Sequence, residues 1–200
     1  MKFLARIKLV DLIQCAVGTV LVFATMYLTN VLGGSEAVYF LLLSLILGIW
    51  GIWFGGFWSL LSTQIGGMLV APFLGELLDK QFLINFSTWL EALVPGVIFR
   101  TMRLDPKCKR LEDITGYVGA ALIACFMNVL ATISIYSTYG HLPFGGWKYW
   151  VYASTWFVND ALAMLSAVLV FRTLSSRVLK SGLYINGYFF RTKKFKPIKF

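Results

Sequence analysis

The stretch DITGYVGAALIACFMNVLATISIYS at residues 113–137 indicates how this chain folds. Its only acidic or basic side chain is Asp113, at the first position. As an α-helix it is about 37 Å long, enough to cross the roughly 30 Å of hydrocarbon in a bilayer. Further apolar runs occur along the chain, and the second is short enough to be half-embedded or steeply packed. The sequence predicts six membrane helices, at residues 9–31, 37–49, 51–75, 81–101, 113–137 and 148–178.

The composition favours an integral membrane protein. Of the 200 residues, 58% are hydrophobic and 14% are charged, whereas soluble domains are about half apolar and about a quarter charged. A soluble domain of this size needs more charge to cover its surface. This argues against a soluble enzyme, a secreted disulfide-linked module and a disordered chain. We expect an all-α bundle of six transmembrane helices in residues 1–180, followed by a basic cytoplasmic tail in residues 181–200.

The basic residues predict the orientation of this bundle. The net charge is +9, and all Lys and Arg residues except Lys80 and Lys148 lie in residues 2–8, 100–110 or 172–199. Cytoplasmic segments of membrane proteins carry an excess of Lys and Arg, so both termini are expected in the cytoplasm and the chain in the cell membrane. We expect the basic tail to contact anionic lipid head groups. No basic face on a soluble fold is apparent, so nucleic acid is not an expected partner.

Four strongly polar side chains interrupt the last three apolar runs at a similar depth. Glu91, Asn128, Asn159 and Asp160 lie about 14–17 Å from the predicted outer ends of their helices. Such groups are costly in hydrocarbon unless they are paired or line a cavity. We expect them to line a ligand cavity that opens outward, with Glu91 facing the ligand. Alternatively, Asn128 and Asn159 form hydrogen bonds between helices.

Aromatic residues gather at the same end of the predicted bundle. Those nearest the water interface are typical of an aromatic belt, while Tyr136, Trp147 and Trp156 are predicted to form the stacking walls of the cavity. Carboxylates beside aromatic rings suit a flat, cationic or amphipathic organic ligand, through charge pairing, stacking and cation–π contact.

The sequence carries no recognisable motif for chemistry on a substrate. It has a single histidine, His141, and its three cysteines fit no zinc or Cys-x-x-Cys spacing. Walker, Gly-x-Gly-x-x-Gly, nucleophile-elbow and metalloprotease motifs are also missing from it. We therefore expect neither an enzyme nor a resident cofactor or metal.

Several short motifs point to one family. Leu90–Val94 reads LEALV, Val158 precedes Asn159, and the segment 48–56 contains four glycines. These features are similar to helix four, helix six and the junction of helices two and three in the substrate-binding S-components of energy-coupling-factor vitamin transporters. The thiamine-specific members are the most similar, and the resemblance extends over about residues 37–180. In that alignment Asn128 and Tyr136 occupy the places of a ligand-contacting His and Trp.

This resemblance implies a function and a set of partners. The chain would capture thiamine or a related pyrimidine from outside, with Glu91 binding the polar ring of the ligand and Asn128 and Asn159 orienting it. Its partners would be a membrane coupling protein and an ATPase pair. S-components dock on the coupling protein through small residues of helix one, where Cys15 and Thr19 offer such a face. The alternative hypothesis is a membrane-embedded sensory module that binds a small ligand and signals to a partner.

Overall fold

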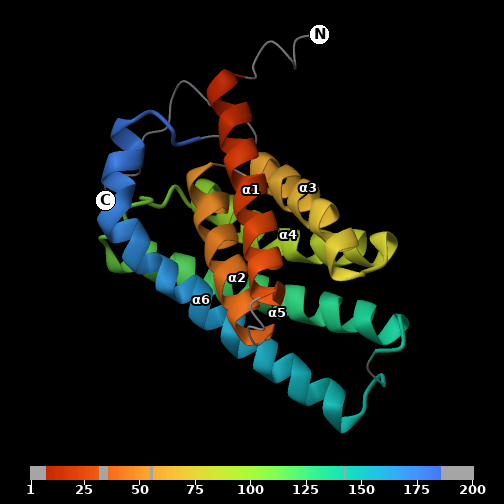
Figure 1. Cartoon of the computed structure of the whole chain (residues 1–200). Coiled ribbons are helices and arrows are strands. Elements are labelled where there is room, and N and C mark those ends of the chain that lie inside the picture. The colour runs from red at the N-terminus through yellow and green to blue at the C-terminus, as the bar shows by residue number, and fades with distance from the viewer. Residues whose placement is uncertain (1–7, 32–35, 55, 142, 186–200) are drawn as a thin grey trace.

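A computed structural model describes residues 8–31, 36–54, 56–141 and 143–185 of the chain (Figure 1). These residues form six α-helices and no β-strand. The helices are α1 (Leu9–Val31), α2 (Glu36–Trp53), α3 (Gly56–Leu74), α4 (Leu78–Thr101), α5 (Leu111–Thr138) and α6 (Trp147–Lys180). All except α2 are long and apolar enough to cross a membrane, as expected of a multi-pass membrane protein. Most of the predicted tail, from residue 186 onward, lies outside the described residues.

The short helix α2 lies in the interior of the bundle. It packs against α1, α3, α4 and α6 (Figure 1), and its apolar part is Leu42–Trp53. Its approach to α4 depends on Gly51, where a Cβ atom would overlap the backbone carbonyl of Ala92. A small residue at a helix crossing lets two backbones come into direct contact. Gly51 therefore fixes the distance between α2 and α4.

Local interactions explain where two of the helices begin or end. At the start of α5, the Asp113 carboxylate accepts hydrogen bonds from the backbone amides of Asp105 at 2.8 Å and Arg110 at 3.4 Å. The Arg110 amide, at the N-cap of α5, otherwise lacks an acceptor. After α3, Gly75 adopts a φ of +68°, a left-handed conformation that suits glycine and stops the helix.

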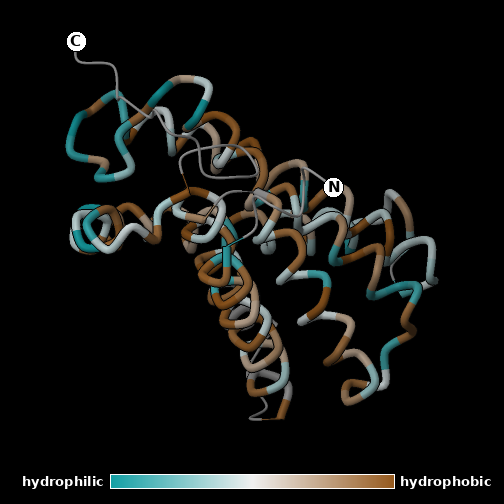
Figure 2. The backbone as a smooth tube through the Cα atoms, turned by 90° about the horizontal axis from the view of Figure 1, so that it is seen from above, coloured by the Kyte–Doolittle hydropathy of each residue, from teal (hydrophilic) through white to brown (hydrophobic). Residues whose placement is uncertain are grey.

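The distribution of side chains is that of a protein surrounded by hydrocarbon. Long hydrophobic stretches run along the helices (Figure 2), and large apolar side chains such as Ile123, Phe126 and Leu169 are exposed on the outside of α5 and α6. Many polar side chains, in contrast, are buried between the helices. This arrangement satisfies polar groups internally and offers apolar groups to lipid.

Different contacts hold the helices together at the two ends of the bundle. At one end, which we call the Arg100 end, the Arg100 guanidinium donates to the carbonyls of Gly51 at 3.1 Å and Ile185 at 2.7 Å. Gln14 of α1 donates to the Leu183 carbonyl at 2.8 Å. The start of α1, the ends of α2 and α4, and the segment after α6 therefore meet at the Arg100 end. The described basic residues of the three groups lie at residue 8, before α1, at residues 100–110, from the end of α4 to the start of α5, and at residues 172–180, in the last turns of α6. The opposite end, here the Lys80 end, carries the connections that follow α3 and α5.

Candidate functional site

Four polar side chains from four helices meet inside the bundle and form what we call the central polar cluster. They are Ser44 of α2, Glu91 of α4, Asn128 of α5 and Asp160 of α6, and all four are buried. The Asn128 amide donates to Glu91 Oε1 at 2.7 Å, and the Ser44 hydroxyl donates to Asp160 Oδ1 at 3.0 Å. The carboxyls of Glu91 and Asp160 also interact directly with each other. The cluster therefore joins two acids with two neutral hydrogen-bonding groups.

The two acids of the cluster are almost completely removed from solvent. Glu91 is 0% exposed and Asp160 is 1% exposed. Glu91 Oε2 is buried without a hydrogen-bond donor among the described residues. A buried carboxylate oxygen normally has a donor, so this oxygen marks a place for a proton or a cationic group.

Hydrogen bonds continue from the cluster toward the Lys80 end. The Thr132 hydroxyl donates to Asn128 Oδ1 at 3.1 Å and lies 2.7 Å from the hydroxyl of Ser87. Ser87 in turn donates to the carbonyl of Ile84 at 2.7 Å. Residues 91 to 84 step back toward the start of α4, while residues 128 to 132 step toward the end of α5. Both helix ends lie at the Lys80 end, so the polar path points there from the centre.

An aromatic pair lies further along the same direction. The rings of Tyr136 and Trp156 pack edge to face with centroids 5.3 Å apart. Tyr136 follows Asn128 by eight residues on α5, a rise of about 12 Å. Its ring centroid is 5.1 Å from Lys80 Nζ. The pair thus separates the central polar cluster from the charged groups of the Lys80 end.

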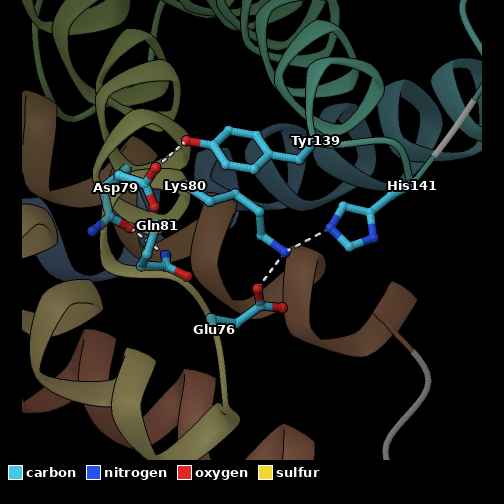
Figure 3. Close-up of polar contacts among 7 residues, drawn as sticks. Glu76, Asp79, Lys80, Gln81, Tyr139 and His141 are labelled. Carbon is cyan, nitrogen blue, oxygen red and sulfur yellow. Dashed lines mark hydrogen bonds and ion pairs between the residues drawn. The ribbon is translucent and has the colours of Figure 1, made fainter.

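The Lys80 end is closed by contacts between the start of α4 and the connection after α5 (Figure 3). Lys80, only 3% exposed, forms an ion pair with Glu76, and its Nζ lies 3.2 Å from His141 Nε2. The Tyr139 hydroxyl donates to Asp79 Oδ2 at 2.7 Å. This hydrogen bond to a carboxylate raises the pKa of the Tyr139 phenol.

The position of Lys80 corrects one expectation from the sequence. The segment 76–80 was expected to be a loop, but α4 begins at Leu78 and Lys80 lies buried in its first turn. An ammonium group can be buried when it is paired. Glu76 and the Tyr136 ring supply the compensating interactions.

The structure brings together most of the residues singled out in the sequence. Glu91, Asn128 and Asp160 meet in the central polar cluster, and Tyr136 contacts Trp156. The Asn128–Glu91 bond joins α5 to α4, as the interhelical alternative expected. The two remaining candidates are not part of these contacts. Asn159 is half-buried, and Trp147 is 81% exposed at the first position of α6.

Two hydroxyl residues of this site were not predicted from the sequence. Ser44 and Thr132 each bond to a member of the predicted set, yet serine and threonine are common inside membrane helices and usually bond to their own backbone. Thr132 follows Asn128 by four residues on α5, a spacing that places the two side chains on one helix face. The partner of Ser44 is revealed only by the packing of α2 against α6.

No group of three or more His, Cys, Asp or Glu side chains within the described ranges is placed to hold a metal ion. Comparison of the chain with protein-family models, curated proteins and solved structures finds no match. The function is therefore inferred from the geometry of the site and from the sequence motifs.

Proposed function

We propose that this protein captures a small, vitamin-like organic molecule with a cationic or hydrogen-bonding ring, thiamine or a related pyrimidine being the first candidate. It would serve as the specificity subunit of an ATP-driven uptake transporter in the cell membrane. The observation that carries this proposal is the buried Glu91, held by Asn128 and facing Asp160. Acidic side chains within a membrane bundle mark ligand and ion sites.

The position of the aromatic pair supports an organic ligand. Tyr136 and Trp156 lie between the acids and the Lys80 end, so a ligand entering from that end meets the rings before the carboxyls. Aromatic faces bind flat rings and organic cations by stacking and by cation–π attraction. The two carboxyls then supply charge and hydrogen-bond acceptors at the inner end of the path.

The charge distribution supports entry from outside the cell. The basic segments meet at the Arg100 end, and Lys- and Arg-rich ends of membrane bundles face the cytoplasm. The Lys80 end then faces outward, with α2 as a sixth, shorter span. The 18 residues of α2 rise about 27 Å, which is close to the thickness of the hydrocarbon layer.

The proposed partners follow from the resemblance to S-components. The sequence has no nucleotide-binding motif, so the energy for uptake would come from an ATPase pair acting through a membrane coupling protein. Cys15 of α1, which was expected on the docking face, is buried, and the exposed surface of the helix instead carries Leu12, Ile13, Val17 and Val20. Such an apolar face packs against lipid or against another membrane helix.

Ligand binding to the detergent-purified protein tests the proposal. The tryptophan fluorescence of the protein is expected to respond saturably to thiamine or to its pyrimidine precursor, because the Trp156 indole lies beside the proposed path. Glu91→Gln should weaken that binding at least tenfold, about 1.4 kcal/mol, because it removes the carboxylate while keeping the side-chain shape. The matched control is Glu112→Gln, an exposed acid in the first turn of α5, which should bind like the wild type.

Two outcomes would contradict this function. If none of a panel of vitamins and pyrimidines changes the fluorescence, capture of a vitamin-like molecule is refuted. If a ligand binds but cells that express the coupling protein and ATPases do not take it up, the sensory alternative is favoured. Equal affinity of Glu91→Gln and the wild type would remove Glu91 from the site.

A further inference from the structure

The Glu91–Asp160 pair poses an electrostatic problem that the ligand-free protein must solve. The two carboxyls interact directly and are 0% and 1% exposed. Two negative charges in contact repel each other strongly, because the interior of a protein screens charges much less than water does. Each charge also loses its hydration on burial. Two ionised carboxylates are therefore unstable here without a positive charge between them.

The groups that face the pair from the neighbouring helices do not supply this charge. Ser44 and Asn128 are neutral donors, and Cys125 and Tyr117 of α5 are the other titratable groups that interact with the pair. Both are neutral when protonated, and their ionisation would add negative charge. The remaining neighbour of α4, the α3 segment Gly56–Leu74, contains no charged or titratable residue.

The nearest cations along α4 have other partners. Arg100 follows Glu91 by nine residues, a rise of about 13 Å, and its guanidinium donates to the backbone carbonyls of four residues: Gly51, Ile52, Gly96 and Ile185. Lys80 precedes Glu91 by eleven residues, about 16 Å, and contacts Glu76 and His141. Both cations are therefore held away from the pair by their own contacts.

We propose that Glu91 and Asp160 share one proton in the ligand-free protein and release it when a monocationic ligand group binds between them. This rests on the proposed function for the identity of the ligand. The shared proton gives Glu91 Oε2 the donor that it lacks among the described residues. In the exchange, the O–H bond of one carboxyl breaks, the proton leaves to water, and the ligand cation contacts both carboxylates.

The exchange conserves the charge buried in the bundle. Two carboxylates with one proton carry a charge of −1, and two carboxylates with one monocation carry the same charge. A neutral ligand would leave the proton in place, and a dication would change the buried charge, which is costly in the membrane interior. The site therefore selects a singly charged group, such as a protonated ring or amine, and a more alkaline solution favours its binding.

The shared proton is tested first without any ligand. In infrared spectra at neutral pH, the wild type should show the C=O band of a protonated carboxylic acid. That band should persist in Glu112→Gln and disappear in the double variant Glu91→Gln/Asp160→Asn. Absence of the band from the wild type overturns the proposal even if the double variant does not fold. Loss of the band on adding sodium chloride alone would assign the site to a metal cation and also overturn it.

Proton release is tested by calorimetry of thiamine and its pyrimidine precursor in buffers of different ionisation enthalpy. Wild-type protein should release one proton for each cation bound, and Asp160→Asn, which leaves a single carboxyl, should release none. Binding without proton release would overturn the exchange while the proposed function stands. A carboxylic-acid band without binding of any vitamin or pyrimidine would refute the proposed function while the shared proton stands.

Discussion

Replacement of Gly51 by alanine tests the contact between α2 and α4 on which the central polar cluster depends. A Cβ atom at Gly51 would overlap the carbonyl of Ala92, and one at Gly96 would lie 2.7 Å from the Gly51 carbonyl. The obstacle in each case is backbone, which cannot rotate away as a side chain can. Relief requires the two helices to separate.

The expected cost of Gly51→Ala follows from this geometry. Inserting a methyl group into a closely packed interior costs about 1–3 kcal/mol. Separation of the helices would also lengthen the 3.1 Å bonds from Arg100 to the carbonyls of Gly51 and Ile52. We therefore expect Gly51→Ala to lower the free energy of unfolding by about 3 kcal/mol, near the upper end of this range.

Gly119 of α5 provides the matched control for this substitution. It lies inside a helix, is exposed, and a Cβ atom there meets no other atom within 4 Å. Gly119→Ala should therefore stabilise the protein by up to about 1 kcal/mol through helix propensity alone. Unfolding in micelles with increasing SDS measures both variants. If Gly51→Ala were as stable as Gly119→Ala, the backbones of α2 and α4 would not be in contact.

Two further predictions concern the Arg100 end. Arg100→Lys keeps the charge but removes the planar guanidinium, which donates to four backbone carbonyls. The free energy of unfolding measured with SDS should therefore fall by about 2–3 kcal/mol. Unchanged stability would contradict this role of Arg100. Burial, and then the nearby Asp113 and Asp105, raise the pKa of the Cys108 thiol to about 12, so the folded protein should resist iodoacetamide at this residue at pH 8. Because the pKa of about 12 exceeds the ordinary value of 9.0, this thiol lowers stability as the pH rises from 9 to 12. Cys108→Ser should reduce this loss of stability at alkaline pH. An equal loss in the variant and the wild type would refute the raised pKa of the Cys108 thiol.

The boundaries of the long helices agree closely with the sequence prediction. The predicted runs at 9–31, 113–137 and 148–178 correspond to α1, α5 and α6, because membrane helices are defined by length and apolar composition. The junction of α2 and α3 was less accurate, since α2 continues to Trp53 rather than ending near residue 49. Gly51 lies inside α2, where its lack of a side chain allows the close contact with α4.

Part of the candidate site could be predicted from the sequence. Depth along the helices grouped Glu91, Asn128 and Asp160, because the rise of a helix is constant and each helix was expected to start at the same surface. Depth does not give the direction of a side chain around the helix. The partly buried Asn159 beside the almost fully buried Asp160 shows how neighbouring residues at one depth can differ.

A helical membrane protein could be recognised from the amino-acid sequence, with basic groups separated by apolar runs and with Glu91 and Asp160 near mid-depth. These properties depend on composition and on spacing along the chain, which a sequence contains directly. The packing of the helices was needed to show that Glu91 faces Asp160 and that Ser44 reaches the same cluster from α2. These contacts depend on helix rotation and on the close approach at Gly51, because groups from four helices meet only when all four pack together.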